Sequence, residues 1–121
     1  MNAELEKVIE DLKKNPKDHD LRRKMAFLLH DGGYEKEALE QLKYLSSIYE
    51  KDDEIYFRLG IIYEKFRQLN EAIASYEKAV ELNPKNPDYM YNLAYCYDIS
   101  DMTDKACLLY TSDAADEARS V

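Results

Sequence analysis

The side chains best suited to chemistry are two histidines and two cysteines, and their spacing does not form a metal site. His19 lies between Asp18 and Asp20 near the expected start of a helix, as an exposed polar residue. His30 precedes Asp31 at an expected helix end, where an imidazolium suits the helix dipole. A metal site needs three or four converging ligands, and nothing pairs with either histidine at ligand spacing. We therefore expect neither a metal nor a cofactor.

The cysteines and carboxylates are equally poor candidates for catalysis. Cys96 lies between two tyrosines on an expected helix, which indicates a buried and inert thiol. The neighbouring carboxylates Asp52 and Asp53 are more simply interpreted as solvated helix caps than as an acid–base pair. Glycine-rich phosphate loops and the G-x-S-x-G and H-E-x-x-H motifs are all missing from the sequence. The sequence therefore predicts no catalytic residue and no enzymatic activity.

The composition indicates one acidic domain. The chain has 121 residues, of which 45% are hydrophobic and 35% are charged, so a core can form beneath a solvated surface. The net charge of −8 and the lack of a basic stripe disfavour binding to nucleic acid or to an anionic membrane. Two cysteines are too few for a disulfide scaffold. Without an apolar leader or an apolar run of membrane-spanning length, we expect a reduced, cytoplasmic location.

The elements that would position any functional side chain are helices. Apolar residues at helical spacing, with caps and breakers, predict helices at about 3–14, 19–29, 36–49, 54–66, 71–82 and 87–99, and a further stretch from about 103. Asp18, Asp52 or Asp53, Asn70 and Asn86 are the expected N-caps. Ile48 is expected to face inward. No segment alternates with a period of two, so the fold class is all-α.

These helices repeat with a step of 34 residues. Four columns keep their size and polarity through three rounds: Met25/Leu59/Leu93, Ala26/Gly60/Ala94, Leu29/Tyr63/Tyr97 and Ala38/Ala72/Ala106. A fixed period of this length is typical of a stacked solenoid. In such a fold each helix pair covers the apolar stripe of the next.

The middle round has the clearest motif: Tyr56, Leu59, Gly60, Tyr63, Ala72, Tyr76, Ala79 and Pro84. This pattern resembles the tetratricopeptide repeat, W-x2-L-G-x2-Y…A-x3-F…A…P, with tyrosine in place of tryptophan and phenylalanine. The resemblance implies helix-turn-helix repeats stacked as a right-handed α-solenoid. Gly60 lies in the middle of a helix, where it costs about 1 kcal/mol relative to alanine. We expect a neighbouring helix to approach it closely, as the small Ala72 and Ala79 would allow.

The resemblance also divides the chain. Residues 1–106 form the solenoid: 3–18 match the second helix of a partial repeat, 19–52 and 53–86 are repeats, and 87–106 are a truncated repeat. Residues 107–121 resemble the translation of a sequencing-library adapter. Because the repeat pattern decays where that segment begins, we interpret it as a non-native tail and expect the native protein to differ after Ala106. The alternative is a natural, alanine-rich capping helix.

In the family that this chain resembles, the first helix of each repeat lines a concave face. The matching columns hold a candidate groove of Arg23, Phe27, Phe57, Arg58, Ile61, Tyr91, Asn92 and Tyr95, with Asp20, His30, Glu54, Glu64, Asp88 and Asp98 beside it. Its aromatic and apolar members form a strip with two cations and an acidic rim, which is typical of a binding surface. The alternative is that the strip packs against a neighbouring repeat.

One subclass of the family binds the terminal carboxylate of chaperone tails through a lysine, asparagine and arginine clamp. The matching columns here include Phe27, which cannot serve, and Asp88, which would repel a carboxylate. We predict instead a protein–protein interaction scaffold that binds an extended or helical segment with apolar side chains, whose basic residues would meet the acidic rim. The alternatives are a structural, self-assembling module, with weak self-association, or the repeat region of a larger enzyme or regulator.

Overall fold

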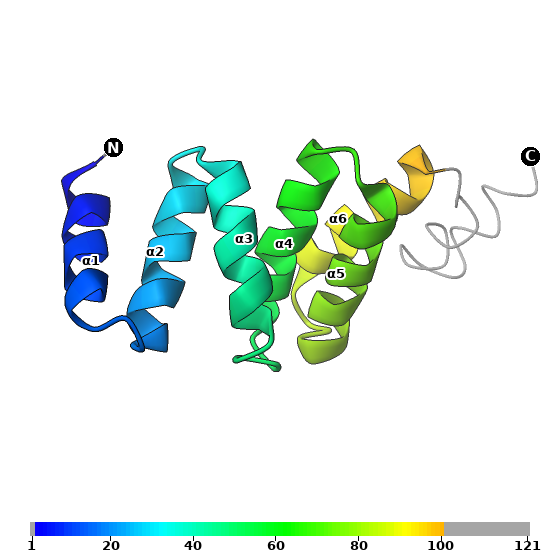
Figure 1. The fold of residues 1–121 in the computed structure, drawn as a ribbon. Coiled ribbons are helices and arrows are strands. Elements are labelled where there is room, and N and C mark those ends of the chain that lie inside the picture. The colour runs from blue at the N-terminus through cyan, green and yellow to red at the C-terminus, as the bar shows by residue number, and fades with distance from the viewer. Residues whose placement is uncertain (1, 101–121) are drawn as a thin grey trace, which may run out of the picture.

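The computed structural model describes residues 2–100, and this part of the chain is entirely helical apart from its turns. The helices are α1 (Ala3–Lys14), α2 (His19–Asp31), α3 (Glu35–Ser46), α4 (Asp53–Lys65), α5 (Leu69–Leu82) and α6 (Pro87–Ile99). Figure 1 shows consecutive helices side by side along one elongated body, and the chain reverses its direction at each turn between them. Contacts join each helix mainly to the next, as expected of a solenoid. The all-α prediction is confirmed.

Side-chain caps start four of the helices. The predicted caps Asp18 and Asn86 accept hydrogen bonds from the backbone N–H groups of Leu21 at 3.0 Å and Asp88 at 2.9 Å. Asp52 caps α4, and Asn2 caps α1. Each carboxylate or amide oxygen satisfies a backbone donor that would otherwise have no partner within its helix.

The predicted cap at Asn70 is wrong. Helix α5 begins at Leu69, so Asn70 already lies in its first turn, and Gln68 at the cap position makes no capping bond through its side chain. The cause is the tight turn after α4. Arg67 adopts a positive φ of 61°, and the N–H of Gln68 returns to the carbonyl of Tyr63 at 2.9 Å. This reversal lets the next helix start earlier than the sequence pattern indicated.

Helix α3 ends before the predicted Tyr49, and Ile48 is 41% exposed where it was expected to face inward. The hydroxyls of Ser46 and Ser47 donate back to the carbonyls of Lys43 and Tyr44 at 2.8 and 2.6 Å. Such local bonds compete with continued helical pairing. The turn that results brings Asp52 to the start of α4.

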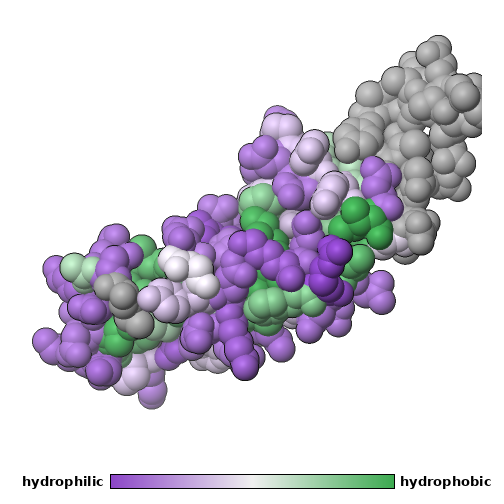
Figure 2. Space-filling model, turned by 90° about the horizontal axis from the view of Figure 1, so that it is seen from above, coloured by the Kyte–Doolittle hydropathy of each residue, from purple (hydrophilic) through white to green (hydrophobic). Residues whose placement is uncertain are grey.

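The core forms two apolar clusters that meet at α4. The first joins residues of α1 to α4, and the second joins α5 and α6. Tyr63 on α4 packs against both clusters. The view in Figure 2 shows a largely hydrophilic surface on which hydrophobic residues gather in separate small patches. The apolar stripes of the helices are therefore largely covered by their neighbours.

Gly60 lies at a close contact between two helices of the middle repeat. A Cβ atom at this position would lie 2.5 Å from Cε1 of Tyr76, well inside a normal contact. The neighbour is thus the large ring of Tyr76, which is fully buried, and not a small side chain as expected. Ala72 and Ala79 are also fully buried, whereas Pro84 is exposed.

We predict that Gly60→Ala lowers the free energy of unfolding by about 1–3 kcal/mol, because the added methyl group collides with the Tyr76 ring. Urea denaturation measures the loss. In a Tyr76→Leu background the collision is removed, and the higher helix propensity of alanine should offset part or all of the cost. An equal loss in both backgrounds would contradict the contact.

Candidate binding face

The candidate groove lies on the face formed by α2, α4 and α6, which we call the first-helix face. Its aromatic and apolar residues differ widely in exposure. Tyr91 and Tyr95 are 62% and 44% exposed, whereas Phe27, Phe57 and Ile61 are half-buried. The predicted strip is therefore divided into an accessible part on α6 and a part that has partners inside the protein.

Phe27 lies between two arginines. The guanidinium carbons of Arg23 and Arg58 are 4.2 and 4.0 Å from the centre of its ring. Arg23 Nε donates to Asp52 at 2.7 Å, and Arg58 Nη1 donates to Asp31 at 2.9 Å. Both cations thus already have an aromatic and an anionic partner. Arg23 joins α2 to the start of α4, and Arg58 joins α4 to the end of α2.

Phe57 connects three helices. Its ring centre lies 4.6 Å from that of Tyr89 on α6 and 5.9 Å from that of Tyr76 on α5. Ile61, one turn further along α4, packs against the second apolar cluster. Both residues are half-buried, whereas Tyr91 and Tyr95 on α6 are exposed.

Polar residues of the predicted groove also have internal roles. Asn92 donates its amide N–H to the carbonyl of Asp88 in its own helix at 2.7 Å. Glu64 accepts hydrogen bonds from the Tyr76 hydroxyl at 3.0 Å and from Cys96 Sγ at 3.6 Å. Glu64 therefore belongs to an interhelical network, while Asp88 and Asp98 remain exposed beside the tyrosines of α6.

The structure reveals a bond between repeats that the sequence pattern did not predict. Asp53 at the start of α4 accepts a hydrogen bond from the Tyr89 hydroxyl at 2.7 Å and one from Asn83 at 3.3 Å. The hydrogen bond from Tyr89 is the main reason that the pKa of Asp53 lies below its ordinary value. The adjacent carboxylates Asp52 and Asp53 were a signal for this bond in the sequence. Only one of them is needed to cap α4, which leaves the other available for a different partner.

The chemically versatile side chains are held in unreactive settings. Burial, reinforced by the nearby Glu64 carboxylate, raises the pKa of the Cys96 thiol to about 12. Burial and the Arg58 guanidinium lower the pKa of His30, whose Nδ1 lies 3.0 Å from Arg58 Nη1. Within residues 2–100, no three histidine, cysteine, aspartate or glutamate side chains are grouped so that they could hold a metal ion.

The remaining sequence predictions concern the membrane and the tail. Among the described helices, none combines the length and apolar character needed to cross a membrane. The segment that resembles a translated adapter, residues 107–121, lies outside the described residues, as does the helix expected from about 103.

Stacked helix pairs with a period of 34 residues and a glycine under an aromatic ring define the class, an α-solenoid of helix-turn-helix repeats. The chain belongs to the tetratricopeptide-repeat family, which matches it over residues 1–55, 54–86 and 75–107. Because each of these matches overlaps the next, the repeat boundaries proposed from the sequence stay predictions.

Known proteins agree with this assignment. Anaphase-promoting complex subunit 3 of Dictyostelium discoideum is 32% identical over 78 residues, which are 64% of this chain and 8% of that protein. A solved structure of MamA from Desulfovibrio magneticus RS-1 shares 25% identity with a TM-score of 0.82, over 96% of this chain and 65% of that one. Another MamA structure shares 26% identity with a TM-score of 0.80, over 88% of this chain and 62% of that one. The chain thus spans a small part of the curated relative and less than two thirds of these solved chains.

We predict that the Cys96 thiol is not modified by Ellman's reagent near neutral pH while the protein is folded. The thiolate is the reactive form, and burial beside Glu64 keeps the thiol protonated. A Cys107→Ser variant isolates the signal from Cys96. Full modification should appear only in denaturant. Reaction in buffer at the rate of a small-molecule thiol would show that this prediction is wrong.

We predict that His30 makes the fold less stable in mild acid. Because its folded pKa lies below the ordinary value of 6.5, its contribution is complete above that value and is lost as the pH falls through it towards the lowered one. Urea denaturation of wild type and His30→Gln between pH about 7.5 and about 5.5 tests this. The wild type should lose more stability than the variant over this range, and parallel losses would contradict the burial effect.

Proposed function

We propose that this chain is a protein–protein interaction scaffold that binds an extended or helical segment of a partner in a concave groove on its first-helix face. The observation that supports it most directly is the pair Tyr91 and Tyr95, one helical turn apart and exposed on α6. Tyrosines combine a large apolar surface with a polar hydroxyl, which favours them as anchors in interfaces. Two exposed aromatic rings one turn apart on the same helix form an apolar patch of the kind that marks an interaction site.

The chemistry of this surface suggests what the segment contains. Apolar side chains of the ligand would cover Tyr91 and Tyr95 and reach the half-buried Phe57 and Ile61. Basic residues beside them would meet the exposed Asp88 and Asp98. Such charges raise the association rate and the selectivity more than the final affinity. Asn92, in this proposal, turns its amide oxygen towards a peptide N–H.

The arginines have a different place in the proposal than the sequence pattern suggested. Arg23 and Arg58 hold Phe27 and bind Asp52 and Asp31, so their removal would disturb the repeat stacking. We therefore assign them to positioning the face, with direct ligand contact restricted to their exposed edges. The side chain of Arg58 is only 17% exposed.

A second candidate is a structural module that assembles with copies of itself, or a repeat region that serves a larger enzyme or regulator. The relative in Dictyostelium is by name a subunit of a complex, which suits a scaffold of either kind. The net charge of −8 disfavours contact between identical acidic surfaces. Sedimentation over a range of protein concentrations separates the two, because self-assembly predicts a mass that rises with concentration.

We predict that Tyr91→Ala and Tyr95→Ala each weaken peptide binding on the first-helix face by about tenfold or more, since each removes an exposed anchor. The ligands are obtained by selecting from a display library of random dodecapeptides against the wild-type protein. Titration by fluorescence anisotropy then measures the dissociation constants.

Tyr44→Ala is the matched control, because Tyr44 is 48% exposed but lies on α3, away from this face. All three variants should retain the helical circular dichroism of the wild type. If no selected peptide loses affinity in Tyr91→Ala or Tyr95→Ala, the proposed groove is not a binding site.

A further inference from the structure

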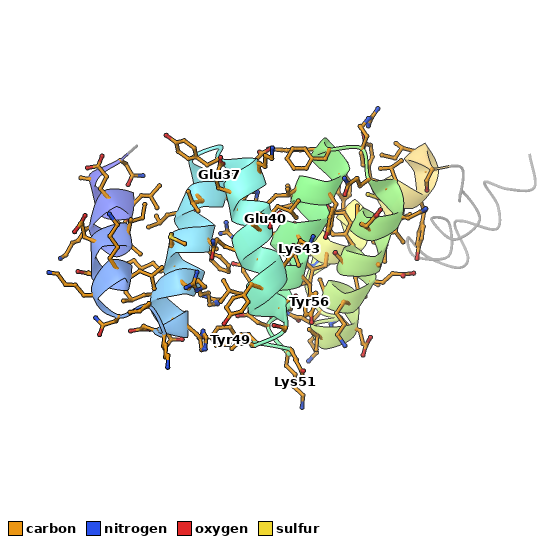
Figure 3. The ribbon with its side chains drawn as sticks, viewed as in Figure 1. Glu37, Glu40, Lys43, Tyr49, Lys51 and Tyr56 are labelled. Carbon is orange, nitrogen blue, oxygen red and sulfur yellow. The ribbon has the colours of Figure 1, made fainter. Side chains whose placement is uncertain are left out.

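The opposite side of the solenoid contains a hollow that the proposed groove does not use. It lies between α3 and α5, the second helices of two successive repeats, and has a volume of about 470 Å³. Its lining consists of Lys43, Ser46, Tyr56, Leu59, Tyr63, Ala74, Ser75 and Lys78. Figure 3 shows Lys43 and Tyr56 on this side of the molecule, in the space between α3 and α5.

The hollow has an aromatic floor and short walls. Tyr56, Leu59 and Tyr63 of α4 form the floor. Ser46 on one side and Ala74 and Ser75 on the other are the small residues of the walls. Because α4 contacts both α3 and α5 whereas α3 and α5 have few contacts with each other, the space between them stays open above α4.

We call the place where α2 packs on α3 the first junction, and the place where α4 packs on α3 and α5 the second junction. The first junction shows which side chains close such a space. A step back of 34 residues from Tyr56, Ser75 and Lys78 leads to Arg22, Gln41 and Tyr44. There, Arg22 Nη1 donates to Gln41 Oε1 at 2.8 Å, and its guanidinium lies 5.5 Å from the ring centre of Tyr44. These long, bonded side chains bridge α2 and α3. At the second junction the Tyr56 hydroxyl donates instead to the Ser46 carbonyl of α3 at 3.4 Å, and within the described residues no hydrogen bond joins Tyr56 to Ser75 or Lys78 on α5. The hollow is therefore a property of that junction and not of the repeat in general.

The charge of the hollow is opposite to that of the chain. Its two charged residues are Lys43 on α3 and Lys78 on α5, and no acidic residue lines it, although the chain as a whole carries −8. Lys43 has no ion pair within residues 2–100, and Lys78 has only an exposed pair with Glu81 at 3.6 Å. Exposed pairs of this kind contribute little, so both ammonium groups can turn towards an incoming anion.

We propose that this hollow is a second docking site, which takes an acidic segment of a partner protein. One apolar or aromatic side chain of the segment packs on Tyr56 and Tyr63, and neighbouring aspartate or glutamate side chains meet Lys43 and Lys78. A hollow of about 470 Å³ has room for the side chains of such a segment. An aromatic floor with a charged rim is also how interfaces concentrate their binding energy.

The experiment is a selection from the random dodecapeptide library against the protein carrying Tyr91→Ala and Tyr95→Ala, so that the first-helix face does not compete. Selected peptides should combine an apolar residue with aspartate or glutamate. Their affinity should fall about tenfold or more for the double variant Lys43→Glu and Lys78→Glu, and should also weaken as salt is added.

Two further variants sharpen the test. Lys51→Glu reverses the charge of one exposed lysine outside the hollow, which is half the charge change of the double variant, and should leave binding intact. Ala74→Glu introduces the residue found at the matching position of the first junction, Glu40, and should abolish binding by placing an anion in the exposed wall of the hollow. The melting temperature of each variant confirms that the fold is retained.

The outcomes separate the two sites. Peptides that bind equally to wild type and to the Lys43→Glu and Lys78→Glu variant overturn this proposal, as does a selection that yields only basic peptides or none. Peptides from the selection against wild type that are lost only in Tyr91→Ala or Tyr95→Ala belong to the first-helix face. The proposal therefore stands or falls independently of the groove on the other side.

Discussion

The rest of the structure depends on the close contact between the Tyr76 ring and the backbone of Gly60. The ring is fully buried and occupies the place where any other residue would carry a Cβ atom. Its hydroxyl reaches Glu64, which also accepts a hydrogen bond from Cys96 on α6. One side chain thus fixes α5 against α4 and, through Glu64, helps to place α6. The exposure of Tyr91 and Tyr95 depends on that placement.

The sequence predicted the parts of the fold that repeat. Apolar spacing identified the helices, the 34-residue step identified the repeat, and the mid-helix glycine at position 60 indicated the close contact there. Local chemistry predicted the caps at Asp18 and Asn86 because a cap needs only a neighbouring backbone donor. It failed at Asn70, where the reversal at Arg67 starts the helix early. A periodic pattern does not register the conformation of a single turn residue.

The candidate site was less predictable, because the pattern locates a column but not the partner of a long side chain. Arg58 extends from α4 to Asp31 and the Phe27 ring on α2, which are separated from it by roughly a full repeat. The hollow between α3 and α5 was missed for the same reason. It exists because Ser75 and Lys78 replace the bonded Gln41 and Tyr44, a difference between repeats that a consensus conceals.

Helix α4 contributes to both faces of the solenoid, and its sequence shows how they are kept apart. Phe57 and Ile61 point to the first-helix face, while Tyr56 and Tyr63 form the floor of the hollow. The fully buried residues of α4, Ile55 and Ile62, bind it to its neighbours between these two surfaces. Since interiors are close-packed and do not deform continuously, this apolar layer fixes both surfaces in the same rigid helix. A solenoid of this construction can present two unlike surfaces, one with acidic residues at its rim and one with lysines. Substitutions on one surface need not change the other, because the buried layer of α4 separates them.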